Sequence, residues 1–204
     1  RSKKRGLRRE PTSATSAIPV NRPKMARKTD YTDFPIKAPR VYEELNKAFN
    51  KDTLFYVGCG LAQIWSGQLQ EIDEPRRYLP SGGAGTLGYE IPAAIGGKVG
   101  CPDQVSVAVV GDGGFMFMAQ ELAMAAHYGI PVIVVIINNG YLSLIRQNQK
   151  YAYDFEYEVK LWYDDTGEKM TDFVKMAESM GCKAERVTGV ENIGNALKRA
   201  KEAD

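Results

Sequence analysis

Asp112 and Asn139 are the residues whose type and position most clearly allow chemistry. Asp112 follows Gly111 at the end of the apolar run 104–110, and Asn139 comes just after the apolar run 131–137. If a helix joins these runs as parallel strands, the right-handed crossover places both carboxyl ends on one edge of the sheet. Ligands of open α/β sheets bind at that edge. We therefore expect Asp112 and Asn139 to converge, although 27 residues separate them.

These residue types suit a hard cation beside an anion. A carboxylate and an amide carbonyl are ligands for octahedral Mg²⁺, which also keeps waters and binds phosphates. Gly113 and Gly114 open the next predicted helix, so their backbone N–H groups and the helix dipole can face an anion. Without side chains they also let a phosphate approach the backbone closely. The residues alone thus indicate magnesium together with a diphosphate.

The order of predicted elements indicates an α/β fold. Apolar runs that predict buried strands lie at 54–58, 104–110 and 131–137, with further strands expected at 183–187 and within 74–83. Helices are predicted at 40–49, 60–70, 114–129, 141–149, 170–181 and 191–203, and after a glycine-rich turn within 83–100. We assign no element to 151–169. Strands that are continuously apolar and alternate with helices predict an open, mostly parallel sheet with helices on both faces.

The net charge of +2 conceals an uneven distribution. Residues 1–40 carry 12 Lys and Arg against 3 Asp and Glu, whereas residues 41–204 carry 15 against 22. The first segment lacks apolar periodicity and predicts an irregular basic linker or arm. One domain is expected over 41–204, without its last strand. Because the positive excess is confined to the arm, we expect no nucleic-acid partner.

Composition excludes several other classes of protein. Cys59, Cys101 and Cys182 are widely spaced, which predicts neither a disulfide framework nor a zinc site and suggests a cytoplasmic location. A single histidine, His127, excludes multi-histidine metal sites. The apolar runs are far shorter than the about 20 residues that span a bilayer, so no membrane association is expected.

The sequence GDG (111–113), a spacer of 24 residues and the pair NN (138–139) resemble the thiamine-diphosphate motif of the decarboxylase and carboligase superfamily. The resemblance implies the thiamine-diphosphate-binding fold and three Mg²⁺ ligands: Asp112, Asn139 and the backbone carbonyl of Tyr141. It also implies cofactor contacts at Gly111, Gly113, Gly114 and Leu142.

Two upstream segments extend the resemblance. GAGTLGYEIPAAIG (83–96) is similar to the segment that holds the aminopyrimidine and thiazolium rings. The resemblance implies that Leu87 is the wedge that bends the cofactor, and that the Gly85 carbonyl accepts a hydrogen bond from the 4′-amino group. GLAQIW (60–65) is similar to the segment that contacts the diphosphate from the other side, through Gly60 and Gln63.

The amino-acid sequence most resembles the glyoxylate carboligase family, and next the acetolactate synthase family, in the segments 27–49, 138–149 and 181–187. The resemblance implies an enzyme that decarboxylates a 2-oxo acid and ligates the remainder to a second carbonyl. Glyoxylate would give tartronate semialdehyde, and pyruvate would give acetolactate. The implied substrate pocket consists of Cys59, Leu87, Leu142, Leu144 and Asn148.

The same resemblance implies that the complete enzyme has components outside this chain. A separate pyrimidine-binding domain or subunit grips the cofactor's other end in this superfamily, and the enzymes are homo-oligomers, dimers or tetramers. A full enzyme can also hold FAD, which would not be bound mainly by this chain. We therefore expect the chain alone to bind the cofactor weakly and to lack turnover.

Two other interpretations stay open at this stage. Gly83, Gly85 and Gly88 fit the G-x-G-x-x-G fingerprint of a Rossmann dinucleotide-binding domain, with Asp112 lying 24 residues further on. That fingerprint requires an apolar strand directly before it, and 74–83 is a poor one. The other interpretation is a non-catalytic binding or assembly module with a degenerate site.

Overall fold

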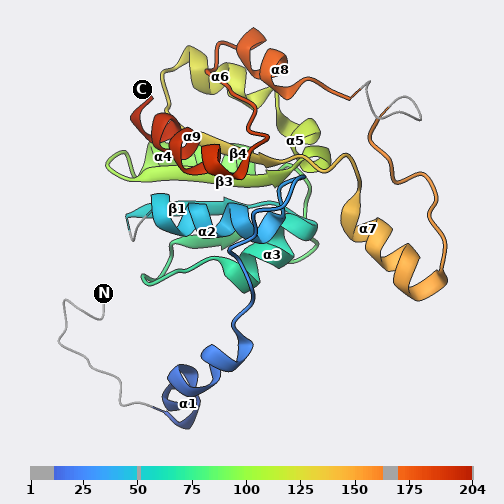
Figure 1. Ribbon diagram of the computed structural model, residues 1–204. Coiled ribbons are helices and arrows are strands. Elements are labelled where there is room, and N and C mark those ends of the chain that lie inside the picture. The colour runs from blue at the N-terminus through green and yellow to red at the C-terminus, as the bar shows by residue number, and fades with distance from the viewer. Residues whose placement is uncertain (1–11, 50–51, 163–169, 204) are drawn as a thin grey trace.

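A parallel four-stranded sheet forms the centre of the domain in the computed structural model, which describes residues 12–49, 52–162 and 170–203 (Figure 1). The strand order is β2-β1-β3-β4, and every neighbouring pair is parallel. The strands are β1 (Thr53–Val57), β2 (Tyr78–Pro80), β3 (Val105–Gly111) and β4 (Ile133–Ile137).

Both faces of the sheet are buried, which explains the continuous apolar runs in the sequence. Along β3, Val107 and Val109 belong to the core on one face, and Ala108 and Val110 belong to the core on the other. Successive side chains of a strand point to opposite faces, so a strand covered on both sides needs apolar residues at every position.

Helices cover the two faces (Figure 1). The helices whose side chains join the core on one face are α2 (Ala38–Ala48), α3 (Leu61–Leu69) and α9 (Ile193–Glu202), the last preceded by a 3₁₀ turn (Val190–Asn192). Those on the other face are α4 (Glu90–Gly100), α5 (Asp112–Met118), α6 (Glu121–His127) and α8 (Phe173–Ser179). The predicted α/β class with helices on both faces is confirmed.

Helix α7 (Ser143–Asn148) stands apart from these layers. It continues into a π-helical turn (Gln149–Tyr153) and projects beyond the sheet (Figure 1). Neither segment contains a buried residue.

Two predicted elements differ from the structure. Residues 183–187 form no strand, and their charged side chains instead make surface ion pairs, Glu185 with Arg199 and Arg186 with Asp172. The helix predicted over 114–129 is two helices, α5 and α6, separated at residues 119–120. Periodicity alone did not reveal this break, because the apolar residues continue across it.

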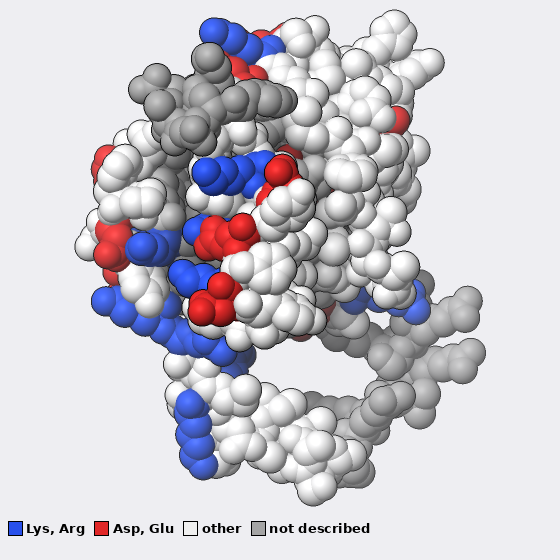
Figure 2. Space-filling model, turned by 90° about the vertical axis from the view of Figure 1, so that its right-hand side faces the viewer, with Lys and Arg blue, Asp and Glu red and all other residues white. Residues whose placement is uncertain are grey.

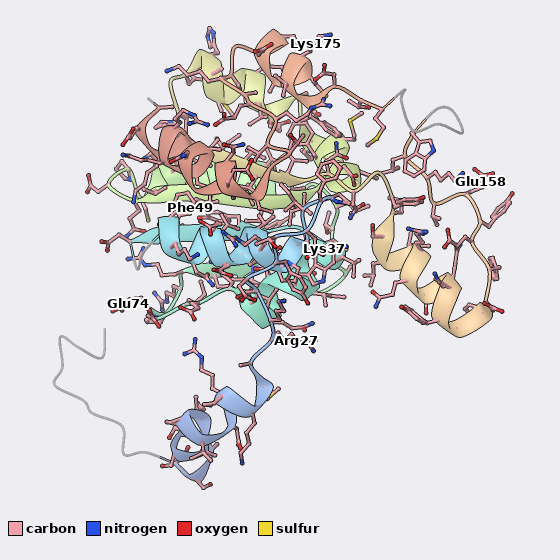
Figure 3. The ribbon with its side chains drawn as sticks, in the orientation of Figure 1. Arg27, Lys37, Phe49, Glu74, Glu158 and Lys175 are labelled. Atoms are coloured by element: carbon pink, nitrogen blue, oxygen red, sulfur yellow. The ribbon has the colours of Figure 1, made fainter. Side chains whose placement is uncertain are left out.

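The basic arm is not wholly irregular, contrary to the prediction. It contains α1 (Ser13–Asn21), which begins with a capping box formed by Thr12 and Thr15, and a 3₁₀ turn (Pro23–Met25). No residue of either element is buried. Arg27 lies where the chain passes from this arm toward α2 (Figure 3). Capping and local hydrogen bonds, and not a core, therefore hold α1.

An open cavity of about 710 Å³ lies between the arm and the surfaces of α2 and α3. The strand ends that carry Asp112 and Asn139 do not line it. Within the described part of the chain, no helix combines the length and apolar character needed to cross a bilayer.

Helix α2 docks through Tyr42 and Leu45, which are fully buried. Pro39 lies in its first turn, and Arg40 pairs with Glu44 along its surface at a distance of 3.0 Å. The hydroxyl of Tyr42 donates a hydrogen bond of 2.7 Å to the backbone carbonyl of α3 residue Ala62. This bond joins α2 to the helix that follows β1.

Replacing Tyr42 by Phe removes that hydroxyl and leaves a buried carbonyl without its donor. We expect the free energy of unfolding to fall by about 1–2 kcal/mol, measured by urea denaturation. Tyr151→Phe, at a side chain that is 80% exposed, is the matched control and should leave stability unchanged. Equal stability of the Tyr42 variant and the wild type would contradict the role given to the hydroxyl.

Candidate functional site

Asp112 and Asn139 lie together at the carboxyl ends of β3 and β4, as the sequence predicts. The register pairs Gly111 with Ile137, so the chain leaves both strands at the same level. The Oδ2 atom of Asp112 accepts hydrogen bonds from the backbone N–H groups of Asn139, at 3.0 Å, and Gly140, at 2.5 Å.

The carboxylate of Asp112 is buried and held by a third backbone donor. Its Oδ1 atom accepts a hydrogen bond of 2.8 Å from the N–H of Gly113. Burial raises the pKa of Asp112, and the N–H groups of Gly140, Gly113 and Asn139 lower it by less. A cation beside this carboxylate would favour its charged form.

The side chain of Asn139 organises the turn after β4. Its Oδ1 atom accepts hydrogen bonds from the backbone N–H of Tyr141, at 3.0 Å, and from the hydroxyl of Ser143, at 2.7 Å. The same hydroxyl donates to the carbonyl oxygen of Tyr141 at 3.2 Å. Ser143, which sequence reasoning did not single out, thus bridges two of the oxygens that the resemblance assigns to the metal.

The three assigned oxygens suit a magnesium ion chemically. A carboxylate, an amide carbonyl and a backbone carbonyl are all hard donors, and hydrogen bonds link the residues that carry them. Within the described ranges, no group of three or more His, Cys, Asp and Glu residues could hold a metal.

A returning segment fastens the turn that contains Tyr141. The backbone N–H of Leu142 donates to the carbonyl of Val159, and the N–H of Leu161 donates to the carbonyl of Gly140, both at 2.9 Å. These two bonds form an antiparallel bridge over the turn. The aromatic stretch to which the sequence assigned no element therefore positions one of the assigned metal ligands.

Aromatic contacts reinforce the same turn. The rings of Trp162 and Tyr141 meet edge to face, with centroids 4.5 Å apart. Gly140 has a φ of +72°, and a Cβ there would lie 2.6 Å from the Trp162 ring, so this position requires glycine. On the other side of Tyr141, the guanidinium of Arg146 lies 3.9 Å from the ring centroid and pairs with Glu156 at 2.9 Å.

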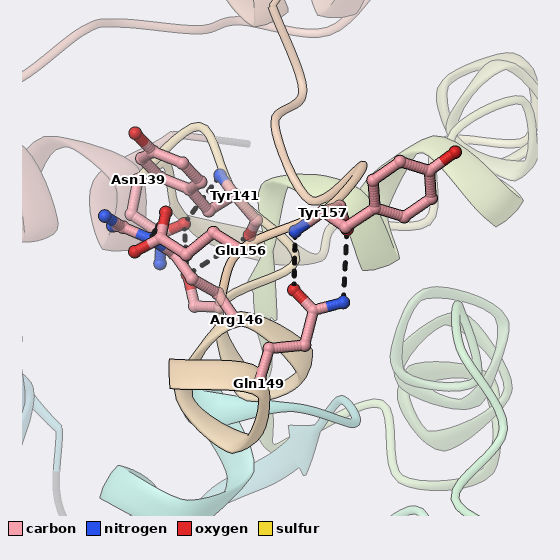
Figure 4. A network of polar contacts seen from close by, with 7 residues as sticks. Asn139, Tyr141, Arg146, Gln149, Glu156 and Tyr157 are labelled. Carbon is pink, nitrogen blue, oxygen red and sulfur yellow. Dashed lines mark hydrogen bonds and ion pairs between the residues drawn. The ribbon is translucent and has the colours of Figure 1, made fainter. Parts of the chain in front are cut away.

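Gln149 holds the beginning of the returning segment. Its side-chain amide donates to the carbonyl of Tyr157 at 3.1 Å and accepts from the N–H of Tyr157 at 3.0 Å (Figure 4). Contacts therefore hold the returning segment both before the turn, at Tyr157, and after it, at Trp162. Residues 163–169, the remainder of the unassigned stretch, lie outside the described residues.

Two apolar side chains border the glycines that follow Asp112. A Cβ placed on Gly113 would lie 3.0 Å from Cδ2 of Leu142, and one placed on Gly114 would lie 3.9 Å from Cδ2 of Leu87. The structure therefore brings Leu87 and Leu142 to the predicted anion site. The N–H of Gly113 already donates a hydrogen bond to the side chain of Asp112, so this N–H is not fully available to an anion.

The loop that carries Gly85 meets the segment that follows β1. A Cβ on Gly85, whose φ is +67°, would lie 3.4 Å from the sulfur of Cys59. The side chain of Gln63 donates a hydrogen bond of 3.1 Å to the carbonyl of Ser81, which links α3 to this loop. Gly60, with a φ of +99°, makes the turn into α3. These sequence-predicted residues thus form one neighbourhood.

Leu144 and Asn148 are not drawn into that neighbourhood. Both lie on α7, which projects from the body, and both are exposed, Leu144 at 37%. This chain by itself does not enclose the substrate pocket that the resemblance implies.

The topology removes the dinucleotide-binding interpretation of Gly83, Gly85 and Gly88. In a Rossmann domain the strand before the glycine loop and the strand after its helix are neighbours. Here the loop follows β2 and the next strand is β3, but β1 lies between them. The fingerprint had matched by glycine spacing alone.

Glu90 is a further residue of this region that sequence reasoning missed. It begins α4, is fully buried, and within the described part of the chain neither carboxyl oxygen has a hydrogen-bond partner on another residue. A Cβ on Gly58 would lie 2.5 Å from its Cδ, and one on Gly114 would lie 3.3 Å from its Oε1. Burial raises the pKa of Glu90 to about 7, and its own backbone N–H lowers it by less. The available signal was an acidic residue inside the apolar run 89–96.

Comparison with known proteins places these residues in a family context. Residues 58–204 match the family model of the thiamine pyrophosphate enzyme C-terminal TPP binding domain. Glyoxylate carboligase of Escherichia coli O157:H7 is 42% identical over 182 residues, which are 87% of this chain and 30% of that protein. The acetolactate synthase large subunit of Corynebacterium glutamicum is 42% identical over 163 residues, which are 79% of this chain and 26% of that protein.

A solved structure supports the fold. The thiamine diphosphate-dependent 4-hydroxybenzoylformate decarboxylase of Rhodococcus jostii RHA1 superposes with a TM-score of 0.77 at 22% identity, covering 87% of this chain and 32% of that chain. The chain thus spans less than a third of the length of the two curated relatives named above.

The raised pKa of Glu90 predicts that the free energy of unfolding falls as the pH rises. Its pKa is about 7 in the folded chain and ordinarily 4.5, so the folded state holds more protons between these values. The free energy of unfolding therefore decreases as the pH rises through this window, and above it the loss is complete. Relative to Glu90→Gln, the wild type should lose roughly 2 kcal/mol between pH 5 and pH 8.

Urea denaturation at several pH values measures this difference. The quantity compared between the wild type and Glu90→Gln is the slope of the free energy of unfolding against pH, because the introduced amide also changes the absolute stability. Glu121→Gln removes a carboxyl from the neighbouring helix α6 and should keep the wild-type slope. Parallel profiles for the wild type and the Glu90 variant would contradict the prediction.

Proposed function

The chain belongs to the thiamine pyrophosphate enzyme family, as its C-terminal cofactor-binding domain, and from this premise we propose that it binds the diphosphate and Mg²⁺ of thiamine diphosphate in a carboligase. The observation that carries the proposal is the junction of Asp112 with the turn at Asn139 and Gly140. It brings a buried carboxylate to the turn that supplies amide and backbone oxygens.

We assign the metal to three residues of this chain. Asp112, Asn139 and the carbonyl of Tyr141 would hold Mg²⁺, with Ser143 orienting the last two. Segments 111–114 and 60–63 would border the diphosphate from two sides, and Leu142 would cover it beside Gly113. The charge of a bound metal would offset the free-energy cost of burying the Asp112 carboxylate.

The remaining residues would orient the organic part of the cofactor. Leu87 lies against Gly114 and would act as the wedge under the bent cofactor, and the carbonyl of Gly85 would accept from its amino group. When bound, thiamine diphosphate supplies the carbon nucleophile that attacks a 2-oxo acid. The protein's part is to hold, bend and desolvate that group.

We propose glyoxylate as the substrate, with tartronate semialdehyde as product. The similarity to a glyoxylate carboligase supports this assignment, and an equal identity of 42% to an acetolactate synthase makes pyruvate condensation the second candidate. Cys59 would line the substrate pocket beside Gly85, and Leu144 and Asn148 would complete it from α7.

A pyrimidine-binding domain or subunit would cover this side of the chain in a homo-oligomer. Met116 and Phe117 on α5, next to the assigned site, are 46% and 58% exposed. Figure 2 shows that half of the face turned toward the viewer carries few charged side chains. A partner domain would bury the exposed side chains of Met116 and Phe117 and enclose α7. FAD, where the enzyme holds it, would bind outside this chain.

The three cysteines are free, which supports a reducing, cytoplasmic location as part of the same proposal.

Removal of the Asp112 carboxylate tests the cofactor site. In the protein assembled with its pyrimidine-binding domain, Asp112→Ala and Asp112→Asn should lose Mg²⁺-dependent thiamine diphosphate affinity. The loss should exceed the roughly 10–100-fold typical of removing an outer partner of a metal ligand. Calorimetry measures the affinity, and circular dichroism confirms folding. Asp172→Asn, at the exposed cap of α8, is the control. Unchanged affinity in both Asp112 variants would refute the metal assignment.

Product analysis tests the reaction. The assembled protein should convert glyoxylate to tartronate semialdehyde with release of CO₂, and this chain alone should give no product, because half of the cofactor would lack its binding domain. Acetolactate from pyruvate in place of tartronate semialdehyde would favour the second candidate. Turnover by the chain alone would contradict the need for a partner domain.

A further inference from the structure

Glu90 places a carboxyl group inside the region that the proposed function assigns to a diphosphate. We propose that Glu90 is a proton-binding residue of this site, which has to be a neutral carboxylic acid for the diphosphate to bind, so that cofactor binding takes up one proton. The inference rests on the proposed function and adds to it a loss of affinity as the pH rises, which is opposite in sign to the effect of deprotonating a metal-binding carboxylate such as Asp112.

The position of the carboxyl group is the first support. It lies between Gly58, which follows β1, and Gly114, the third residue of α5. Any side chain at Gly58 would collide with it, since even a Cβ would stand 2.5 Å from Cδ. Gly114 belongs to segment 111–114 and Gly58 lies two residues before segment 60–63, the two segments that would border the diphosphate. The carboxyl group therefore stands between the two borders of the site.

The absence of a compensating charge is the second support. Among the described residues, neither oxygen has a hydrogen-bond partner on another residue, and the side chain has no solvent exposure. Lys98, the cation of α4, donates to the carbonyls of Pro102 and Gln104 beyond the other end of the helix. Other titratable side chains on the elements that enclose Glu90 are Tyr56, Cys59, Tyr89, Asp112, Glu121 and His127.

None of these groups offers Glu90 a nearby positive charge. Asp112 is itself acidic, and His127 is exposed at the C-terminal end of α6. The N-terminus of α4 favours a negative charge, because the helix dipole is positive there. Burial outweighs this effect and raises the pKa of Glu90 to about 7. At neutral pH the residue is therefore divided between its acid and its carboxylate.

A bound diphosphate would shift this balance in one direction. Its negative charges repel a carboxylate across a region of low dielectric, whereas they leave a neutral acid unaffected. A protonated carboxyl group is also a hydrogen-bond donor and can serve an anion directly. The ligand thus binds the protonated form better, and by linkage its affinity declines as the pH rises above about 7.

Calorimetry on the assembled protein tests this inference. Thiamine diphosphate with saturating Mg²⁺ is titrated between pH 6 and pH 8.5, in buffers of different ionisation enthalpy, so that affinity and proton uptake are both measured. Because a phosphate group itself titrates near pH 6, the result is the difference between the wild type and Glu90→Gln. From pH 7 to pH 8.5 the dissociation constant of the wild type should rise roughly tenfold more than that of the variant. At pH 8 the wild type should take up close to one additional proton.

Two further variants sharpen the comparison. Glu90→Leu, a second neutral replacement, should show the same flat profile if Glu90→Gln folds poorly. Glu121→Gln on α6 should behave as the wild type does. Equal pH dependence and equal proton uptake in the wild type and both Glu90 variants would overturn this inference alone. A wild type that fails to bind thiamine diphosphate even at pH 6 would overturn the proposed function, and this inference with it.

Discussion

The carboxylate of Asp112 ties the end of β3 to the turn after β4, and the geometry of the candidate site depends on this interaction. Parallel pairing brings the two strands level, but it does not hold the chain beyond them. The N–H groups of Asn139 and Gly140 meet the carboxylate directly, and this fixes where the turn begins. Asn139 then holds Tyr141 and Ser143. A chain of backbone and side-chain hydrogen bonds thus runs from one buried charge to every assigned metal ligand.

Small residues around this charge allow neighbouring side chains to approach the backbone closely. Gly113 and Gly114 stand beneath Leu142 and Leu87, and added side chains would fill the intervening space. Gly58 makes room for the Glu90 carboxyl group in the same way. Buried acids without cations reduce the stability of the folded chain. This region therefore contributes less to the stability of the folded chain than an apolar core of the same size would, which is typical of binding sites for charged ligands.

Sequence reasoning succeeded where periodicity and residue type carry the information. The strands at 53–57 and 105–111 were recognisable because they are buried on both faces of the sheet, and 133–137 because its apolar run is unbroken although the strand is only half-buried. It failed at 183–187, where the residues predicted as a strand form no ladder, and at α1, where a local capping box makes a helix without apolar periodicity. The break between α5 and α6 was also invisible, since apolar residues run through it. In each case the outcome depends on a specific hydrogen-bonding pattern and not on average composition.

The sequence by itself determined the α/β class and the meeting of Asp112 with Asn139, because a right-handed crossover places the ends of parallel strands on one edge of the sheet. Only the tertiary structure decided that Trp162 and the returning segment hold the Tyr141 turn, that Leu87 meets Gly114, and that Glu90 is enclosed without a partner. These contacts join residues far apart in the chain through shape and burial, and neither property is encoded in a local pattern. The unpaired acid is therefore visible only once the residues around it are in place.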